Sequence, residues 1–183
     1  MRRANAVISM ALMILFFIHM IWGGLELVGI ISGGSYVFSI FTYLMVILLC
    51  VHVVIGIIYT IRTIMVTHKA GRFYIRENML FLIRRISGFA LLIFATVHMF
   101  IFHGRVDGGH YYLSLFDMGA LISQILLVLS LVVHLICNIT PLRISLGITD
   151  KMNLRTDIIL VISIVLMMSA VAFIIYYLRW QMV

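Results

Sequence analysis

Residues 36–66 read YVFSIFTYLMVILLCVHVVIGIIYTIRTIMV, and Arg62 is the only Asp, Glu, Lys or Arg among them. A helix of about 20 apolar residues is long enough to cross the hydrocarbon core of a bilayer. The whole chain has 183 residues, of which 64% are hydrophobic and 10% charged, whereas soluble domains are about 45–50% apolar and about 25% charged. Residues 36–66 are therefore predicted to form a transmembrane helix, and lipid is predicted to surround most of the protein.

Four further apolar stretches predict four more transmembrane helices. They cover residues 5–31, 79–103, 116–139 and 157–178. Turn or breaker signals separate the stretches, at Gly33-Gly34-Ser35, at Asp107-Gly108-Gly109 and at Thr140-Pro141. The apolar run after Arg2-Arg3 imitates a secretory signal, but no small-residue cleavage site follows it, so we expect a retained helix. We expect an all-α integral membrane protein with five transmembrane helices in one domain, residues 1–183.

The basic residues predict the orientation of these helices. Eleven of the thirteen Lys and Arg fall on the side of the N-terminus, and only Arg105 and Arg179 fall on the other side. By the positive-inside rule, the N-terminus is expected in the cytoplasm and the C-terminus outside. This distribution also accounts for the net charge of +7, so no nucleic-acid partner is expected.

Four of the seven histidines lie well inside the predicted spans, one on each of the first four helices. They are His19, His52, His98 and His134. Ionisable groups at this depth are costly and usually mark function. At 1.5 Å per residue, His19 and His98 lie roughly 21 and 28 Å from the inner ends of their helices, and His52 and His134 lie roughly 24 and 27 Å from the outer ends of theirs.

These depths predict two level pairs, His19 with His98 in the outer half and His52 with His134 in the inner half. Two imidazoles that face each other across a four-helix bundle suit the axial ligation of haem iron. We therefore expect the first four helices to form a bundle that binds two haems b.

The neighbouring residues agree with haem sites. Gly23 and Gly56 each lie four residues after a pair histidine, where a small residue leaves room for a flat porphyrin. Arg84, Arg85 and Ser87 open the third helix at the inner face and are expected to hold the haem propionates.

A metal transporter is the competing use of paired histidines. Zinc sites often combine histidine with carboxylates, but five of the six acidic residues lie in predicted loops or at helix ends. The sixth, Glu26, lies near the outer end of the first helix. Haem is therefore the favoured reading of the histidines.

Several runs resemble a known family, the dihaem cytochrome b subunit of succinate:quinone oxidoreductases and quinol:fumarate reductases. The family has an Arg-x-(Ser/Thr)-Gly run in its third helix, which matches Arg85-Ile86-Ser87-Gly88 ahead of His98. The similarity also covers the second and fourth helices, at Val51–Gly56, Gly71–Tyr74 and His134 with Gly147–Thr149. It is the type with one five-helix anchor and two haems.

This resemblance implies the partners. A flavoprotein with covalent FAD would hold the dicarboxylate site, so this chain would not bind fumarate or succinate itself. An iron–sulfur subunit would dock on the basic cytoplasmic face, between Arg62 and Arg85 and at Arg143. Electrons would pass through the two haems to or from menaquinone near the outer surface of a prokaryotic cytoplasmic membrane. A dimer of the whole complex is also expected.

Two features depart from the family. The 33 positions from His19 to His52 are fewer than the family usually has, so the outer loop is trimmed. Some fumarate reductases of this type carry a glutamate two residues before the last histidine, which moves protons. That position is Val132 here, so this proton route is expected to be missing.

The quinone site is expected at the outer end of the first helix. Glu26 lies seven residues after His19, about two turns, and therefore on the same helix face. A carboxylate there could exchange a proton with quinol, and an interfacial charge that reaches water is the alternative. Trp22, His103 and Arg105 are further candidates to line the site.

Two alternatives remain open at this point. The chain could be the haem anchor of another quinol-linked enzyme, of the formate dehydrogenase or nitrate reductase type, or it could be a metal transporter. The sequence does not set the direction of the reaction, since the same anchor serves succinate oxidation and fumarate reduction.

Overall fold

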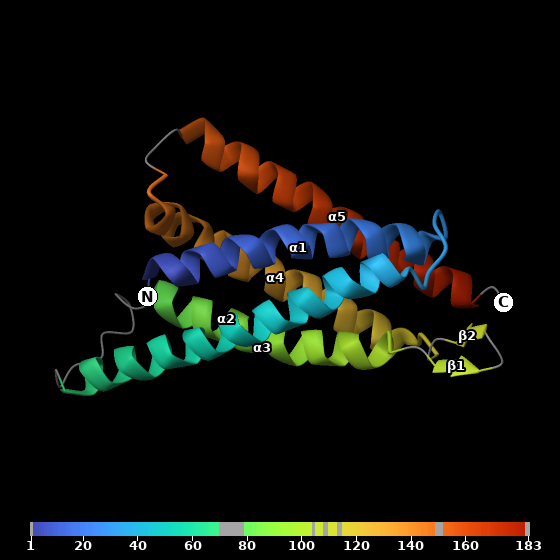
Figure 1. Cartoon of the computed structure of the whole chain (residues 1–183), viewed down its shortest axis with the longest axis horizontal. Coiled ribbons are helices and arrows are strands. Elements are labelled where there is room, and N and C mark those ends of the chain that lie inside the picture. The colour runs from blue at the N-terminus through green and yellow to red at the C-terminus, as the bar shows by residue number, and fades with distance from the viewer. Residues whose placement is uncertain are drawn as a thin grey trace.

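The computed structural model describes residues 2–69, 79–103, 105–107, 110–112, 115–148 and 152–181. Five long helices run roughly along the long axis of the molecule (Figure 1), and each is long and apolar enough to cross a membrane. They are α1 (Arg2–Val28), α2 (Tyr36–Lys69), α3 (Met79–Ile101), α4 (Met118–Leu146) and α5 (Met152–Gln181). The prediction of an all-α membrane protein with five transmembrane helices is confirmed.

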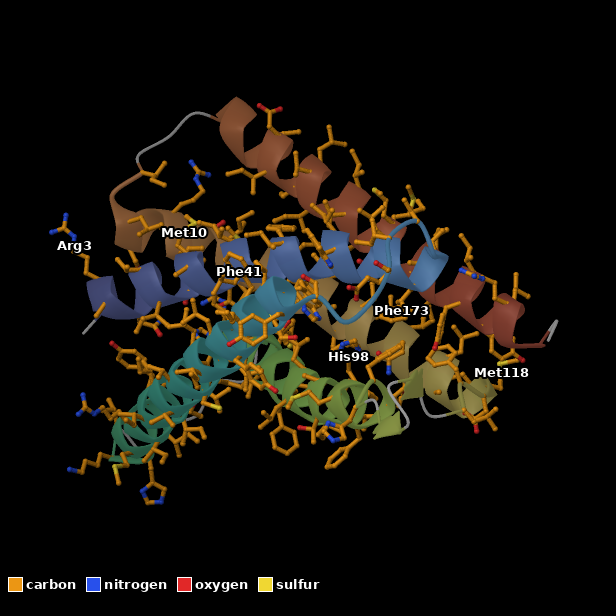
Figure 2. The ribbon with its side chains drawn as sticks, turned by 45° about the vertical axis from the view of Figure 1, so that its right-hand side comes forward. Arg3, Met10, Phe41, His98, Met118 and Phe173 are labelled. Carbon is orange, nitrogen blue, oxygen red and sulfur yellow. The ribbon has the colours of Figure 1, made fainter. Side chains whose placement is uncertain are left out.

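The helices pack around α1. This helix contacts α2, α4 and α5, while α3 packs against α4. Because α5 also contacts α4, it covers the side of α1 and α4 that is turned away from α2 and α3 (Figures 1 and 2). Between the described residues, α2 and α3 share no extensive interface. The four histidine-bearing helices therefore form a bundle that is open between α2 and α3.

The tightest apolar packing lies between α4 and α5, away from this opening. Phe116, just before α4, and Leu166 of α5 are almost fully buried. The cluster that they join consists of Phe116, Ala120, Val128, Leu131, Ile139, Ile162, Leu166 and Phe173. In contrast, none of the described side chains of α2 is buried to the same degree. The side chains of α2, the helix that carries His52, are therefore packed less tightly than those of α4 and α5.

The first helix ends at Val28, three residues before the predicted limit. Gly29 follows with φ 81°, a conformation that glycine adopts without a steric penalty. The N–H of Ile30 donates to the carbonyl of Leu25 at 3.0 Å, as in a Schellman cap. Arg179 Nη1, near the end of α5, donates to the Val28 carbonyl at 2.7 Å. The last helix therefore completes the capping of the first.

The predicted end of the fourth helix near Thr140-Pro141 is wrong, because α4 continues to Leu146 with Pro141 inside it. Proline has no N–H, so the carbonyl of Cys137, four residues earlier, loses its helical donor. Arg84 Nε of α3 donates to that carbonyl at 2.9 Å. A neighbouring helix thus supplies the hydrogen bond that the proline removes.

A short hairpin connects α3 to α4. Its strands are β1 (Arg105–Asp107) and β2 (His110–Tyr112), and they pair antiparallel with Asp107 opposite His110. The predicted turn signal falls at the tip of this hairpin, where Gly108 and Gly109 lie outside the described residues. The sequence thus predicted a turn here but not the strands.

Candidate functional site

The structure brings His19 of α1 and His98 of α3 together. Their ring centroids are 6.0 Å apart, and the ring planes are inclined at 76°. The two rings are thus in edge contact with each other. These two residues are called the His19 pair below.

His52 of α2 and His134 of α4 form the second group, called the His52 pair. The two rings are close enough to interact electrostatically, and Arg85 lies within electrostatic range of both. His19 and His98 are thus in ring contact, and His52 and His134 lie within electrostatic range of each other.

A polar side chain from another helix holds each of the four rings, always through Nδ1. In the His19 pair, Thr42 Oγ1 lies 3.4 Å from Nδ1 of His19, and Gln124 Oε1 lies 2.7 Å from Nδ1 of His98. Gln124 is completely buried, and its amide Nε2 donates to Ser123 Oγ at 3.0 Å. This second bond orients the amide so that its oxygen faces the histidine.

The same arrangement recurs at the His52 pair with hydroxyl groups alone. Ser9 Oγ of α1 lies 3.2 Å from Nδ1 of His52, and Ser87 Oγ of α3 lies 3.3 Å from Nδ1 of His134. Each histidine is thus tied to a helix other than its own, which fixes the direction of its ring.

These hydrogen bonds are compatible with one tautomer of the rings, the one that carries its proton on Nδ1. A hydroxyl has one proton to donate, and all three hydroxyls already donate theirs to a backbone carbonyl of their own helix. The bonds are Ser9 to Asn5 at 2.8 Å, Thr42 to Phe38 at 3.1 Å and Ser87 to Arg84 at 3.2 Å. If these oxygens accept from the histidines, as Gln124 Oε1 would, Nδ1 carries the ring proton. The lone pair of each neutral ring is then left on Nε2, the nitrogen that could bind a metal.

Glycines beside the rings have different roles. A Cβ at Gly88 would come within 3.2 Å of the His134 ring, so any larger residue would have to displace that ring by a few tenths of an ångström. At Gly23 a Cβ would meet nothing within 4 Å, which leaves open space beside the first helix. At Gly56 the carbonyl is in use, because it accepts a hydrogen bond from Arg85 Nη1 at 3.3 Å.

The three residues predicted to hold propionates are separated by the structure. The side chain of Ser87 is engaged with His134, and Arg84 is tied to the Cys137 carbonyl. Arg85 points instead to the α2 side, where it bonds Gly56 and lies over the Phe81 ring at 5.1 Å. Of the three, Arg85 is the one whose guanidinium reaches α2.

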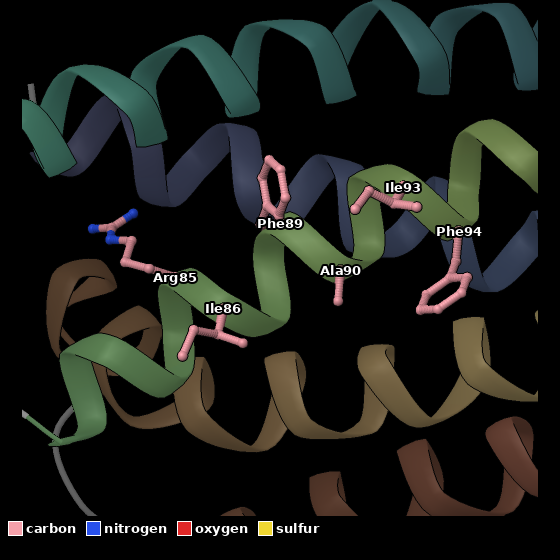
Figure 3. Close-up of a pocket in the computed structure, with 6 residues that line it drawn as sticks. All are labelled: Arg85, Ile86, Phe89, Ala90, Ile93 and Phe94. Carbon is pink, nitrogen blue, oxygen red and sulfur yellow. The ribbon is translucent and has the colours of Figure 1, made fainter.

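A groove of about 510 Å³ runs along α3 from Arg85 (Figure 3). Its lining is apolar apart from the arginine and consists of Arg85, Ile86, Phe89, Ala90, Ile93 and Phe94. Of these residues, Ile86 and Phe89 are about two-thirds exposed. None of the four intramembrane histidines lines this groove, and Arg85 connects one end of it to the His52 pair.

Aromatic side chains connect the His19 pair with the predicted quinone residues. The His19 ring stacks on Phe38 at 5.3 Å, and Phe38 stacks on Trp22 at 5.7 Å. Trp22 Nε1 donates to Glu26 Oε1 at 3.0 Å. Three near-parallel rings thus lead from the histidine to a partly exposed indole that holds a carboxylate.

Aromatic rings also flank the other member of the pair. His98 lies 4.9 Å from Phe102 and 6.2 Å from Phe173 of α5, measured between ring centroids (Figure 2). The sequence predicts that the first four helices form the histidine bundle, which leaves the fifth helix outside it. It does pack on the outside of α1 and α4, but through Phe173 it also contributes one wall at His98.

Two quinone candidates remain, His103 and Arg105. His103 is exposed just beyond α3. Arg105 belongs to β1, and its side chain lies outside the described residues.

The sequence-based prediction missed the groups that hold the rings, Ser9, Thr42 and Gln124, and it missed the close approach at Gly88. A signal was present for Gln124, because an amide in an apolar span is costly unless it is bonded. The hydroxyls gave no such signal, since serine and threonine in membrane helices commonly bond to their own backbone.

No family model, curated protein or solved structure matches this chain. Its function is therefore inferred from the residues and their geometry.

Proposed function

We propose that this chain is the dihaem cytochrome b membrane anchor of a succinate:quinone oxidoreductase or quinol:fumarate reductase. The observation that carries the proposal is the common state of the four intramembrane histidines. All four are held through Nδ1 by a residue of another helix. Ligand histidines are usually oriented by such an outer hydrogen bond.

The grouping of the histidines favours haem over a transported metal ion. Structural zinc sites need four protein ligands and catalytic ones three, but no cluster of three or more His, Cys, Asp or Glu is found among the described residues. Two histidines match the two axial positions of a haem iron. Bound haem would supply one-electron redox chemistry, and the chain's own residues would set the ring orientation, the apolar surroundings and the nearby charge.

Three further observations fit a haem. The helices around the pairs leave the bundle open between α2 and α3. Glycine at position 88 brings α3 against the His134 ring. Arg85 has a buried Nε with no hydrogen-bond partner, so an anionic group of the cofactor would find a donor there. A haem held at each pair would use His19 and His98, and His52 and His134.

The quinone reaction is assigned to the end of the bundle where Glu26 and Trp22 lie. A quinone exchanges electrons and protons together, and Glu26 is a carboxylate that could take up the proton. The stacked rings of Trp22, Phe38 and His19 place that carboxylate beside the His19 pair. Menaquinone is the quinone that the family resemblance implies.

The topology and partners follow the same proposal. With the N-terminus in the cytoplasm, the His52 pair lies toward the basic cytoplasmic face, where the iron–sulfur subunit would dock and the FAD-bearing flavoprotein would follow. Residues 70–78, expected to form part of this docking face, lie outside the described residues.

An optical experiment on the protein purified from membranes tests the proposal. The reduced-minus-oxidised spectrum should show b-type haem, and a pyridine haemochrome assay should give two haems per chain. Low-temperature EPR should show two low-spin ferric signals, as two imidazole ligands per iron require. A haem-free protein that binds zinc with its histidines would instead establish the transporter. Haem together with a co-purifying formate dehydrogenase or nitrate reductase would establish the other anchor.

A further inference from the structure

One face of α2 carries His52, Gly56 and Tyr59, at spacings of four and three residues. Such spacings keep side chains on the same side of a helix, so Tyr59 lies on the side of the histidine, about two turns along the helix. Its hydroxyl is buried and has no hydrogen-bond partner. This is unusual, because buried tyrosine hydroxyls normally find a partner.

A second unpaired donor lies close to this face, across the opening between α2 and α3. Arg85 Nη1 reaches the Gly56 carbonyl at 3.3 Å, one turn from Tyr59, while Arg85 Nε is buried without a partner. Among the described residues, no carboxylate forms a salt bridge with this guanidinium. Its position over Phe81 provides a cation–π contact but no hydrogen-bond acceptor.

The Tyr59 hydroxyl and the Arg85 guanidinium can both be satisfied by the same kind of partner, an acceptor oxygen. A buried donor left unpaired is costly, and an anionic oxygen is the acceptor that bonds most strongly to a hydroxyl and a guanidinium. Neighbouring groups do not fill this role, since the described hydrogen bonds of Arg84 and Ser87 go to Cys137 and to His134.

We propose that Tyr59 and Arg85 together bind a carboxylate, a propionate of the haem held by His52 and His134. The inference rests on the proposed function and adds Tyr59 to the haem site. The hydroxyl of Tyr59 donates to one carboxylate oxygen, and the guanidinium of Arg85 supplies both a donor and the compensating charge. Haem binding would in this way satisfy the buried donors on α2 and α3 and draw the two helices together.

The variant Tyr59→Phe removes the hydroxyl and leaves the ring. The matched control is Tyr43→Phe on the same helix, where the tyrosine is 71% exposed. In the purified protein, Tyr59→Phe should release the haem of the His52 pair about tenfold faster than the wild type, while the haem of the His19 pair and the control are unchanged. Arg85→Gln should act on the same haem. Equal release from the wild type and from Tyr59→Phe would overturn the inference.

A modified cofactor tests whether the carboxylate belongs to haem or to another anion, such as a lipid headgroup. Protein made in haem-deficient cells is loaded in detergent with haem b or with its dimethyl ester, which has no free propionate. The difference between wild type and Tyr59→Phe should be present with haem b and absent with the ester. If the difference persists with the ester, the carboxylate is not a propionate and the inference fails. If neither the wild type nor Tyr59→Phe takes up haem b or the ester, the proposed function fails as well.

Discussion

Aromatic rings and a buried amide surround the His19 pair, whereas hydroxyls, a glycine and an arginine surround the His52 pair. The shortest hydrogen bond to any of the four rings is at His98, where Gln124 Oε1 lies 2.7 Å from Nδ1 in a fully buried position. The corresponding distance is 3.4 Å at His19, and at the His52 pair the distances are 3.2 and 3.3 Å. In both environments the polar partner contacts Nδ1 of each ring. The contacted nitrogen is therefore common to the two pairs, whereas the surrounding residues differ.

The difference has an electrostatic consequence for the proposed haems. Reduction adds an electron, and the cation of Arg85 beside the His52 pair would stabilise that charge. The amide oxygen at His98 makes its imidazole a stronger donor to the metal, which favours the oxidised state. We therefore expect the haem of the His52 pair to have the higher potential, so that electrons collect at the end of the bundle away from Glu26.

The largest effect should come from removing a ligand. His98→Ala should abolish the haem of the His19 pair, and His134→Ala that of the His52 pair, because each iron loses one of its two axial ligands. The haem-to-protein ratio should fall from two to one in each variant, and His103→Ala should keep both haems. Loss of both haems from one variant would show that haem binding at one pair depends on the other. The two pairs could then not be treated as independent sites.

Among the described residues, a carboxylate is linked to the His19 pair, through Trp22 and Phe38, and none to the His52 pair. Glu26→Gln should therefore affect the two ends of the molecule differently. The amide keeps the bond to Trp22 possible but cannot take up a proton. Quinone turnover should therefore fall by about 100-fold. Both haems and the dye-linked activity of the flavoprotein should remain. If turnover is unchanged, Glu26 is an interfacial charge and the proton acceptor lies elsewhere.

The hydrogen bonds to Nδ1 should contribute unequally to haem binding at the two pairs. Gln124→Leu leaves the Nδ1–H of His98 buried without an acceptor, so haem binding at the His19 pair should weaken by about 10- to 100-fold. Ser87→Ala removes a longer bond and should weaken the His52 pair less. Rates of haem loss from the purified variants measure both effects, with Ser163→Ala on the exposed part of α5 as the control. A larger effect at Ser87 would reverse the order of the two sites.

The smallest expected effect is on redox potential. Arg85→Leu should lower the potential of the His52-pair haem by several tens of mV, since one nearby positive charge is lost. Arg3→Leu, an exposed arginine at the start of α1, should have no such effect. A redox titration followed optically would resolve the two haems. A higher potential at the His19 pair in the wild type would contradict the electrostatic argument.

Much of the fold could be predicted because lipid imposes a simple requirement. A span must be apolar for about 20 residues, and five stretches met this condition where the five helices lie. The constant rise of a helix then predicted which histidines lie at the same depth. Both inferences use only distances along the chain, which the sequence contains.

The errors arose where a contact between helices overrides a local signal. Pro141 is a good helix breaker in isolation, but Arg84 of α3 supplies a donor to the carbonyl that the proline strands. The partners of the rings could not be predicted for the same reason, since Thr42 and Ser9 were not distinguishable from other hydroxyls in the spans. Neighbouring helices also had to be known before Phe173 could be placed at His98.

The bond from Arg84 to the carbonyl of Cys137 has a consequence for biogenesis. The ribosome makes α3 before α4, so for a time α3 carries two adjacent arginines without the helix that receives one of them. A charged side chain within a span opposes release into lipid. When α4 follows, the carbonyl of Cys137 lacks a helical donor because of Pro141, and the side chain of Arg84 can donate to it. We therefore expect α3 and α4 to leave the insertion machinery together, as a hairpin whose two unfavourable groups cancel each other.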